Sequence, residues 1–107
     1  MRQRVKITVL KKEFYPDLAD KYLTEGRAAG ACPELNEGDS FIYEGGAVMP
    51  EGFCPWAWVE LYPQAAAMAG RVENSWYKPN THVSCCMDGV RPVIFLLEGM
   101  EEPNEEG

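Results

Sequence analysis

The residues of this chain best suited to chemistry are its four cysteines, which are Cys32, Cys54, Cys85 and Cys86. A thiolate is a nucleophile and also a ligand for soft metals. Four thiolates match the ligand count of a structural zinc ion and of an iron–sulfur cluster. Because the chain contains no C-x-x-C pair, a metal site needs ligands from three separate segments. We therefore interpret the four cysteines as candidate metal ligands.

Two of these cysteines also have features of reactive thiols. Cys54 precedes Pro55, and because proline suits the first position of a helix, Cys54 is expected at the N-cap. Unpaired N–H groups and the helix dipole at that position favour a thiolate. If Asp88-Gly89 forms a two-residue turn, Cys86 lies opposite Arg91, whose guanidinium also favours a thiolate. Both thiols are thus candidates for nucleophilic or redox chemistry, the alternative being two small buried residues.

The remaining cysteines and the single histidine give weaker signals. Neighbouring strand residues point to opposite faces, so Cys85 and Cys86 serve one site only if the strand bulges or ends there. Pro92 favours such an irregularity, and a Cys85–Cys86 disulfide would be strained and therefore redox-active. Cys32 lies in a loop directly before a proline, a stiff setting that suits a metal ligand. His82 is a candidate partner for a nearby thiol, although a lone histidine at a strand start is typically structural.

Four aromatic residues are candidates for the wall of a pocket, namely Trp56, Trp58, Trp76 and Tyr77. In a domain of this size they are explained as well by packing in the core. The chain contains no phosphate-binding loop, no dinucleotide-binding fingerprint and no Gly-x-Ser-x-Gly nucleophile motif. The sequence therefore gives no indication of a nucleotide-binding protein or of a serine hydrolase of these types. The cysteines stay the leading candidates for functional residues.

Charge and hydropathy exclude several kinds of partner. Ten Lys and Arg residues against 17 Asp and Glu give a net charge of −7, which disfavours nucleic acid. Residues 1–12 are basic and residues 98–107 are acidic. No apolar run is long enough for a signal peptide or a membrane span, so we expect a cytoplasmic protein with reduced thiols. The expected partner is another protein or a small molecule, and no membrane is involved.

The hydrophobic pattern predicts an α+β fold: a small antiparallel or mixed β-sheet with a C-terminal hairpin, packed by one main and one short helix. Its single domain is expected to cover residues 1–98, with a disordered acidic tail at 99–107. Asp17 is the expected N-cap of the short helix, which Gly26 ends. Pro63 is expected to kink the main helix or to divide it into 55–62 and 63–69. The predicted strands are 4–11, 40–44, 83–87 and 90–97.

The last strand is expected to be central in the sheet and to pair with the first strand. Residues 93–97 are apolar on both faces, which is typical of a central strand. The first strand carries Lys6 on its polar face, and the last strand ends at Glu98. Opposite charges across two strands stabilise their pairing, so we expect these two residues to lie across from each other.

Three motifs resemble those of a known family, namely residues 30–33 (GACP), 52–58 (GFCPWAW) and 85–95 (CCMDGVRPVIF). The family consists of small four-cysteine proteins, mostly from anaerobic bacteria and archaea, with no established activity. The resemblance extends from Val5 to Glu98. It implies that all four cysteines belong to the family signature, together with Asp88, Gly89 and Arg91. It also implies an anaerobic physiology, in which iron–sulfur centres and free thiols survive.

Three functions stay open on the sequence alone. The first is a cysteine-ligated metal centre, and the acidic charge and the anaerobic setting favour an iron–sulfur cluster over zinc. The second is a thiol redox or nucleophilic enzyme that uses Cys54 or Cys86. The third is a small accessory or binding module with structural cysteines and no cofactor. Further site candidates are Arg91, Asp88, Trp56, Trp58 and His82.

Overall fold

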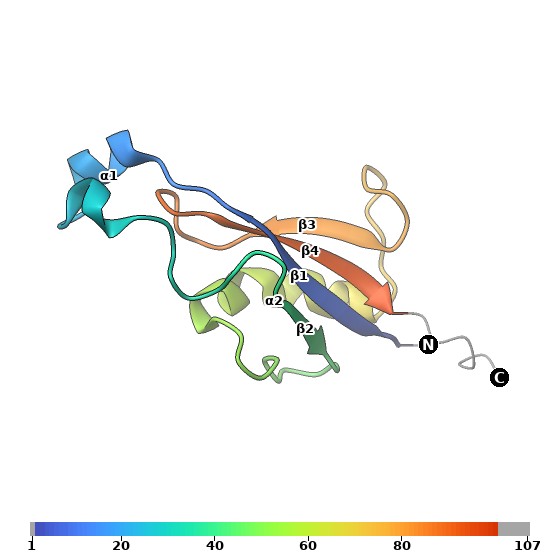
Figure 1. Cartoon of the computed structure of the whole chain (residues 1–107). Helices are drawn as coiled ribbons and strands as arrows, with labels where there is room; N and C mark the ends of the chain where they lie inside the picture. The colour runs from blue at the N-terminus through green and yellow to red at the C-terminus, as the bar shows by residue number, and fades with distance from the viewer. Residues whose placement is uncertain (1, 101–107) are drawn as a thin grey trace.

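A four-stranded antiparallel sheet with one long helix on one face forms the body of the protein (Figure 1). The computed structural model describes residues 2–100. The strand order is β2-β1-β4-β3, so β1 and β4 are central. In chain order the elements are β1 (Arg4–Lys12), α1 (Pro16–Tyr22), the short 3-10 helix η1 (Gly26–Ala29), β2 (Ser40–Tyr43), α2 (Pro55–Ala69), β3 (Thr81–Cys85) and β4 (Val93–Met100). The predicted α+β fold, with one main helix, one short helix and a C-terminal hairpin, is confirmed.

The core lies between the sheet and α2. Alternate residues of β1, namely Val5, Ile7 and Val9, are fully buried on the face that α2 covers. Phe95 and Leu97 of β4 lie on the same face and are also fully buried. This alternation is the ordinary pattern of a strand with one face against a helix. The predicted central position of the last strand is therefore confirmed by the strand order.

The pairing of β1 with β4 also has the predicted register. Lys6 of β1 lies directly across from Glu98 of β4. The register shifts between Val9 and Lys11, which marks a β-bulge near the end of β1. Beyond this bulge the same two chain segments stay together, because the Glu13 N–H donates to the Pro92 carbonyl at 2.8 Å.

Helix α2 is continuous over Pro55–Ala69, so the predicted division into two helices is wrong. Pro63 lies inside the helix and removes a hydrogen bond to the carbonyl of Val59. Both residues are exposed on the outer surface, where water can satisfy that carbonyl. The inner face packs on the sheet through Ala57, Leu61, Ala65 and Met68. Within residues 2–100 neither helix combines the length and the apolar character that a membrane span requires.

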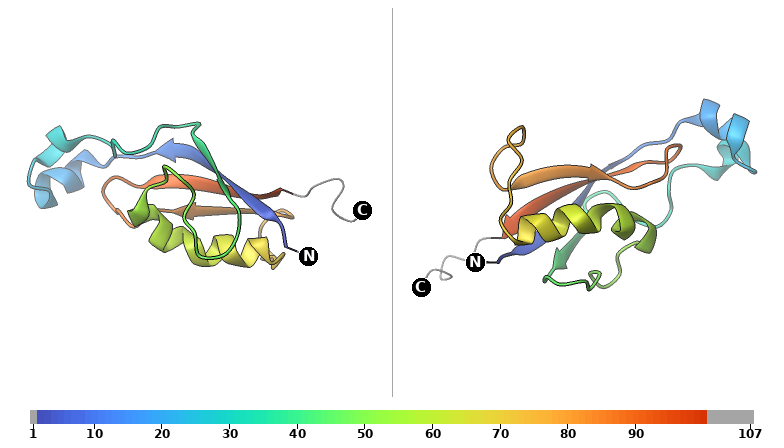
Figure 2. Two further views of the ribbon diagram at one scale, coloured as in Figure 1. Left: turned by 90° about the horizontal axis from the view of Figure 1, so that it is seen from below. Right: turned by 180° about the vertical axis from the view of Figure 1, so that it is seen from behind.

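The short helix differs in its ends from the prediction. Tyr15, and not Asp17, is the N-cap of α1, because Pro16 already occupies the first helical position. The helix ends at Tyr22, and Gly26 instead begins η1. Figure 2 shows α1 and η1 as an arm that projects beyond the end of the sheet. Within this arm, hereafter the α1–η1 arm, Asp20 accepts hydrogen bonds from the backbone and the guanidinium of Arg27 at 2.8 Å each.

The connection between β3 and β4 is longer than predicted. Cys85 pairs with Ile94, so residues 86–92 form the loop and the predicted two-residue turn at Asp88-Gly89 is wrong. Pro92 has no N–H to donate to the strand ladder. The Asp88 side chain instead accepts two loop N–H groups, from Val90 and Arg91, at 2.9 and 3.0 Å. These bonds stabilise a wide loop in place of a tight turn.

Two expectations for the loop and the tail also need correction. Trp76 of the 71–80 loop does not pack in the core, because 75% of it is exposed. Tyr77 is half-buried there, and its hydroxyl donates to the Val83 carbonyl at 3.1 Å. Gly99 and Met100 belong to β4 and not to the expected tail. The rest of that tail, residues 101–107, lies outside the described residues.

A buried amide group joins the ends of β1, α2 and β4. The Gln3 side-chain amide donates to the Met68 carbonyl and to the Asn80 side chain, both at 2.9 Å. Asn80 in turn donates to the carbonyl of Gly99 at 3.1 Å. A Cβ atom built on Gly99 would overlap the side-chain amides of Asn80 and Gln3. Any side chain at position 99 must therefore displace these two amides.

We predict that Gly99→Ala lowers the free energy of unfolding by about 1–3 kcal/mol, because the added methyl must displace this buried network. Urea unfolding measures the change. Gly89→Ala is the matched control, because a Cβ at Gly89 meets open space, and its stability is expected to stay close to that of the wild type. Equal effects of the two substitutions would contradict the packing argument.

Candidate functional site

Three of the four cysteines line one cleft, although they come from distant parts of the chain. The cleft has a volume of about 430 Å³, and Cys32, Cys54 and Cys86 contribute to its wall. We call it the three-cysteine cleft. Its other lining residues are Pro33, Glu34, Leu35, Trp56, Ala57, Met87, Asp88, Arg91, Val93 and Phe95. Thiols thus share this space with an apolar floor from β4 and with three ionisable side chains.

Cys54 occupies the predicted N-cap of α2. Its carbonyl accepts the first helical N–H, from Trp58, at 2.9 Å. The preceding residue, Phe53, is buried and packs edge-on to Phe41 with ring centroids 5.0 Å apart, and against Phe95 at 5.3 Å. This aromatic anchor fixes the start of the helix and holds the half-buried Cys54 at the cleft wall.

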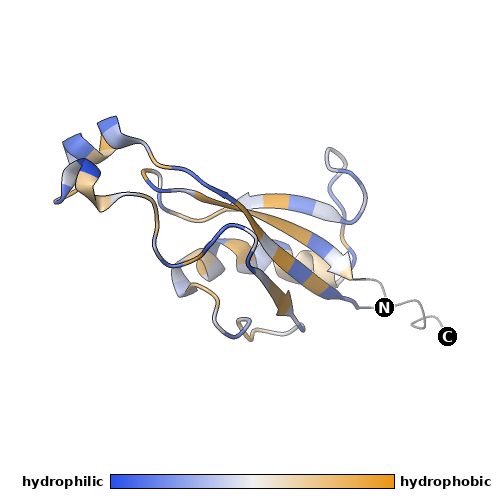
Figure 3. Cartoon of the chain, viewed as in Figure 1, coloured by the Kyte–Doolittle hydropathy of each residue, from blue (hydrophilic) through white to orange (hydrophobic). Residues whose placement is uncertain are grey.

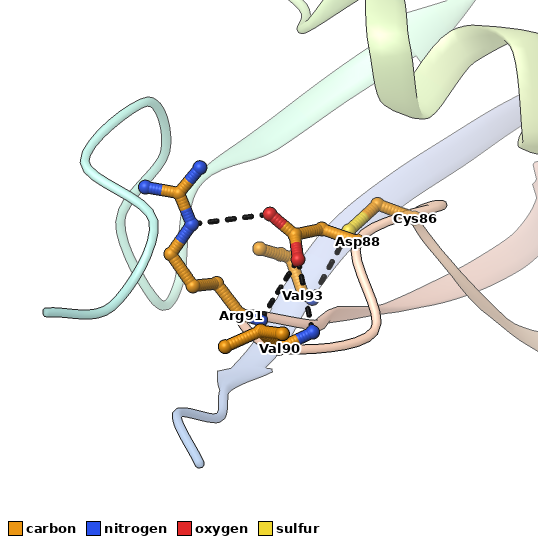
Figure 4. A network of polar contacts seen from close by, with 5 residues as sticks. All are labelled: Cys86, Asp88, Val90, Arg91 and Val93. Carbon is orange, nitrogen blue, oxygen red and sulfur yellow. Dashed lines mark hydrogen bonds and ion pairs between the residues drawn. The ribbon is translucent and has the colours of Figure 1, made fainter. Parts of the chain in front are cut away.

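Cys86 is held at the beginning of the β3–β4 loop. Its N–H donates to the Val93 carbonyl at 3.1 Å, and its sulfur accepts the Val93 N–H at 3.4 Å (Figure 4). The predicted contact of Cys86 with Arg91 is wrong, because the register differs from that of a two-residue turn. Figure 4 shows the Arg91 guanidinium turned to Asp88, to which its Nε donates at 3.1 Å.

Asp88 organises the loop that carries these groups. Its burial opposes ionisation, but this effect is outweighed by hydrogen bonds from the Val90 and Arg91 N–H groups and from the Arg91 guanidinium. The net result is a pKa below the ordinary value of 3.8. The carboxylate is therefore ionised at neutral pH and fixes the direction of the guanidinium at the cleft rim.

Cys32 reaches the cleft from the loop between η1 and β2. Gly30, in a left-handed conformation with φ of 69°, ends η1 and turns the chain toward the sheet. Leu35 is buried in the core, and its carbonyl accepts a hydrogen bond from the Lys12 ammonium at 2.7 Å. The loop is therefore anchored to β1 just after Cys32.

Cys85 does not line the three-cysteine cleft. It is exposed and lies across from Ile94 at the end of β3. Desolvation of the thiol raises its pKa, and the charge of Cys86, a side-chain hydrogen bond with Cys86 and the Glu60 carboxylate of α2 raise it further. None of the four cysteines forms a disulfide. The structure thus places three of the four predicted metal ligands in the wall of the cleft and leaves Cys85 next to Cys86 but outside that wall.

Two other candidates from the sequence lie in structural positions. His82 stacks on Tyr77 with ring centroids 4.4 Å apart, and burial lowers the pKa of its imidazole. Its Nδ1 is 3.1 Å from the Ser84 hydroxyl, and it does not line the cleft. Trp58 packs between Tyr43 and Tyr62 at the edge of the core. Both residues therefore have roles in packing.

Trp56 does line the cleft and is 70% exposed at its mouth. Sequence reasoning missed two neighbours of the cysteines, Glu34 and Met87. Each lies within two positions of a cysteine in the sequence, and this proximity could have identified them as residues of the site. The mouth of the cleft is therefore both aromatic and acidic.

Within residues 2–100, no three or more His, Cys, Asp or Glu side chains are arranged to hold a single metal ion. A tetrahedral zinc site with Zn–S bonds near 2.3 Å needs sulfurs only about 3.8 Å apart. The three thiols share the cleft without forming such a compact group. A mononuclear zinc site would therefore require the cleft to close around the ion.

Comparison with protein-family models, with curated proteins and with solved structures finds no match to this chain. Function is therefore inferred from the residues of the cleft.

We predict that Asp88→Asn lowers the free energy of unfolding at about pH 7 by roughly 1 kcal/mol, because it weakens charge-assisted hydrogen bonds. Since the folded-state pKa lies below 3.8, this stabilisation is present above that pH and is lost as the pH falls through the folded-state pKa. The stability difference between wild type and variant therefore shrinks in acid. Urea unfolding across the acid range measures it, with Glu51→Gln in an exposed turn as control. A difference independent of pH would contradict this role for Asp88.

Proposed function

We propose that the three-cysteine cleft is a metal centre in which Cys32, Cys54 and Cys86 hold an iron–sulfur cluster. The observation that carries the proposal is the convergence of three thiols, from three separate segments, on one cleft of about 430 Å³. Random placement of four cysteines on a small domain does not favour such a meeting. Thiolates are the ligands that iron–sulfur clusters take from proteins.

The arrangement of the thiols disfavours a single zinc ion. Among residues 2–100 no three His, Cys, Asp or Glu side chains are placed to hold one ion. In a cluster, different thiolates bind different iron atoms, so the sulfurs surround a larger volume than the sulfurs of a zinc site. Zinc stays the alternative metal of the proposal.

The surroundings of the thiols suit a negatively charged centre. Cys54 caps the N-terminus of α2, where unpaired N–H groups favour negative charge. The sulfur of Cys86 accepts a backbone hydrogen bond, and such bonds to cluster sulfurs tune the reduction potential. Ala57, Val93 and Phe95 supply apolar walls that limit the access of water.

Three cysteines are one fewer than the four that a four-iron cluster usually takes. With Cys85 outside the wall of the cleft, one iron would stay open to a small molecule at the mouth of the cleft. The proposed activity is therefore electron transfer or the binding of a substrate at that iron. Four free thiols in a short chain also suit a reducing compartment, and we propose the cytoplasm of an anaerobe.

A thiol redox or nucleophilic enzyme is the second candidate. The position of Cys54 at the start of α2 favours it, because a helix N-terminus activates thiols. The raised pKa of Cys85 argues against that residue as the nucleophile. Cys54 is therefore the residue expected to react if the cleft holds no metal.

The test is metal and sulfide analysis, with a visible spectrum, of protein purified without oxygen and without chelator. We expect iron and sulfide, with absorption that bleaches on reduction. Cys32→Ser, Cys54→Ser and Cys86→Ser are each expected to lose most of the iron. Cys85→Ser is the matched control, because its side chain lies outside the cleft, and it is expected to retain the iron.

Loss of iron from Cys85→Ser to the same extent would contradict a three-cysteine site. Protein without iron or zinc, before and after anaerobic reconstitution with iron and sulfide, would overturn the metal centre. Alkylation with iodoacetamide at mildly acidic pH then tests the second candidate. One rapidly modified thiol at Cys54 would support a nucleophile, and uniformly slow reaction would leave an accessory module with structural cysteines.

A further inference from the structure

The second face of the sheet carries a row of apolar side chains that no element of the described chain covers. By register, Ile94 and Leu96 of β4 point away from α2, because Val93, Phe95 and Leu97 point toward it. Val83 of β3 lies across from Leu96, and Ile42 of β2 lies across from Lys6. By register the open face also carries Lys11, Ser40 and Thr81, and it is defined here by residues 6, 8, 11, 40, 42, 81, 83, 94, 96 and 98.

This face differs from the solvated face of an ordinary antiparallel sheet, which alternates to polar residues. Figure 3 shows apolar colour along β4 and in the middle of β3, where that alternation fails. Helix α2 lies on the opposite face (Figure 2). Val83 is exposed, and Ile42, Ile94 and Leu96 are half-buried. Because apolar patches on soluble proteins mark interaction sites, the open face is a candidate surface for association.

The charges on the open face are self-complementary. Lys6 and Glu98 lie side by side on the two central strands, at the same height along the sheet. A two-fold axis that runs parallel to the strands, between β1 and β4, places β1 of one copy over β4 of the other. Lys6 of each copy then faces Glu98 of its partner, and Thr8 faces Leu96.

The other in-plane two-fold axis does not give this match. An axis across the strands at Leu96 places β1 over β1, and Lys6 of one copy then faces Lys11 of the other. Like charges across an interface disfavour that arrangement. Sheets that pack face to face keep their strands within about 30° of parallel. Both axes satisfy this condition, so the charges decide between them.

We propose that two copies of this chain associate through the open face, with a two-fold axis parallel to β1 and β4. The resulting dimer has four layers, with the two sheets inside and the two α2 helices outside. Leu96, Ile94 and Val83 become buried at the interface, and the three-cysteine cleft stays accessible on the outer side of each sheet. The dimer therefore does not depend on the metal centre.

The first test is sedimentation over a wide concentration series. Wild type is expected to dimerise, and Leu96→Lys is expected to weaken association by roughly a hundredfold, because each copy loses a buried leucine. Val59→Lys is the matched control, since Val59 is exposed on the outer face of α2, and it is expected to dimerise as wild type. Circular dichroism checks that all three fold.

The second test uses the charges. In a dimer of Lys6→Glu, the new glutamate of each copy faces Glu98 of the other. In a dimer of Glu98→Lys, the new lysine of each copy faces Lys6 of the other. Because like charges then meet at both contacts, each variant alone is expected to dimerise at least roughly tenfold more weakly than wild type. A mixture of the two variants restores both opposite-charge contacts between copies. Mixing leaves the like-charge neighbours within each chain unchanged, so a folding defect cannot produce this rescue.

A heterodimer in the mixture, with near-wild-type affinity, is the expected result. A wild type that stays monomeric across the series would overturn the proposal and assign the face to a different partner. Dimers of Leu96→Lys as stable as the wild type, or no gain on mixing the charge variants, would overturn it as well. Iron content, measured on the same samples, reports separately on the metal centre.

Discussion

The antiparallel contact between β1 and β4 is the interaction on which the rest of the structure depends. It runs from the pair Arg4 and Met100 to the pair Lys12 and Val93, and so joins the two ends of the described chain. Both edge strands are paired to it, and α2 packs across it. The same two segments continue past the bulge, where the hydrogen bond from Glu13 to Pro92 supports the loop that carries Cys86. The cleft is therefore an extension of the central pair.

Each wall of the cleft reaches its place through a different anchor. Phe53 fixes the helix start, Leu35 fixes the loop of Cys32, and Asp88 fixes the β3–β4 loop. These anchors are buried or hydrogen-bonded, whereas the thiols themselves are half-buried. A ligand site requires accessible thiols on fixed loops. The conformational entropy of these loops is then lost during folding, so ligand binding does not have to order them.

Local signals were sufficient to predict much of the fold. The alternation in β1, the proline at the start of α2 and the apolar run of β4 each depend on a few neighbouring residues. The tight turn at Asp88-Gly89 failed because the same aspartate can also bind backbone N–H groups farther along the loop, and Pro92 prevents the ladder from closing. The sequence left open whether Pro63 kinks or divides the helix, because continuity depends on which side of the helix faces solvent.

The sequence predicted that cysteines form the candidate site, but it did not predict which of the four cysteines line the cleft. Cys54 was placed correctly at the N-cap from its neighbour alone. The exclusion of Cys85 from the cleft wall depends on where β3 ends, which is set by pairing with β4. The approach of Cys32 depends on an irregular loop without any periodic pattern. Long-range register therefore decides which thiols meet.

The wide separation of β1 and β4 along the chain has a consequence for biosynthesis. While the ribosome is still adding residues, β1 has no partner for its inner edge, and the core cannot close until β4 has emerged. Closure of the core therefore waits for β4, as is typical of topologies dominated by distant contacts. Cys32 and Cys54 are synthesised before Cys86, and the three residues line one cleft only once β4 has paired with β1. A cofactor that all three cysteines hold can therefore bind only after β4 has been made.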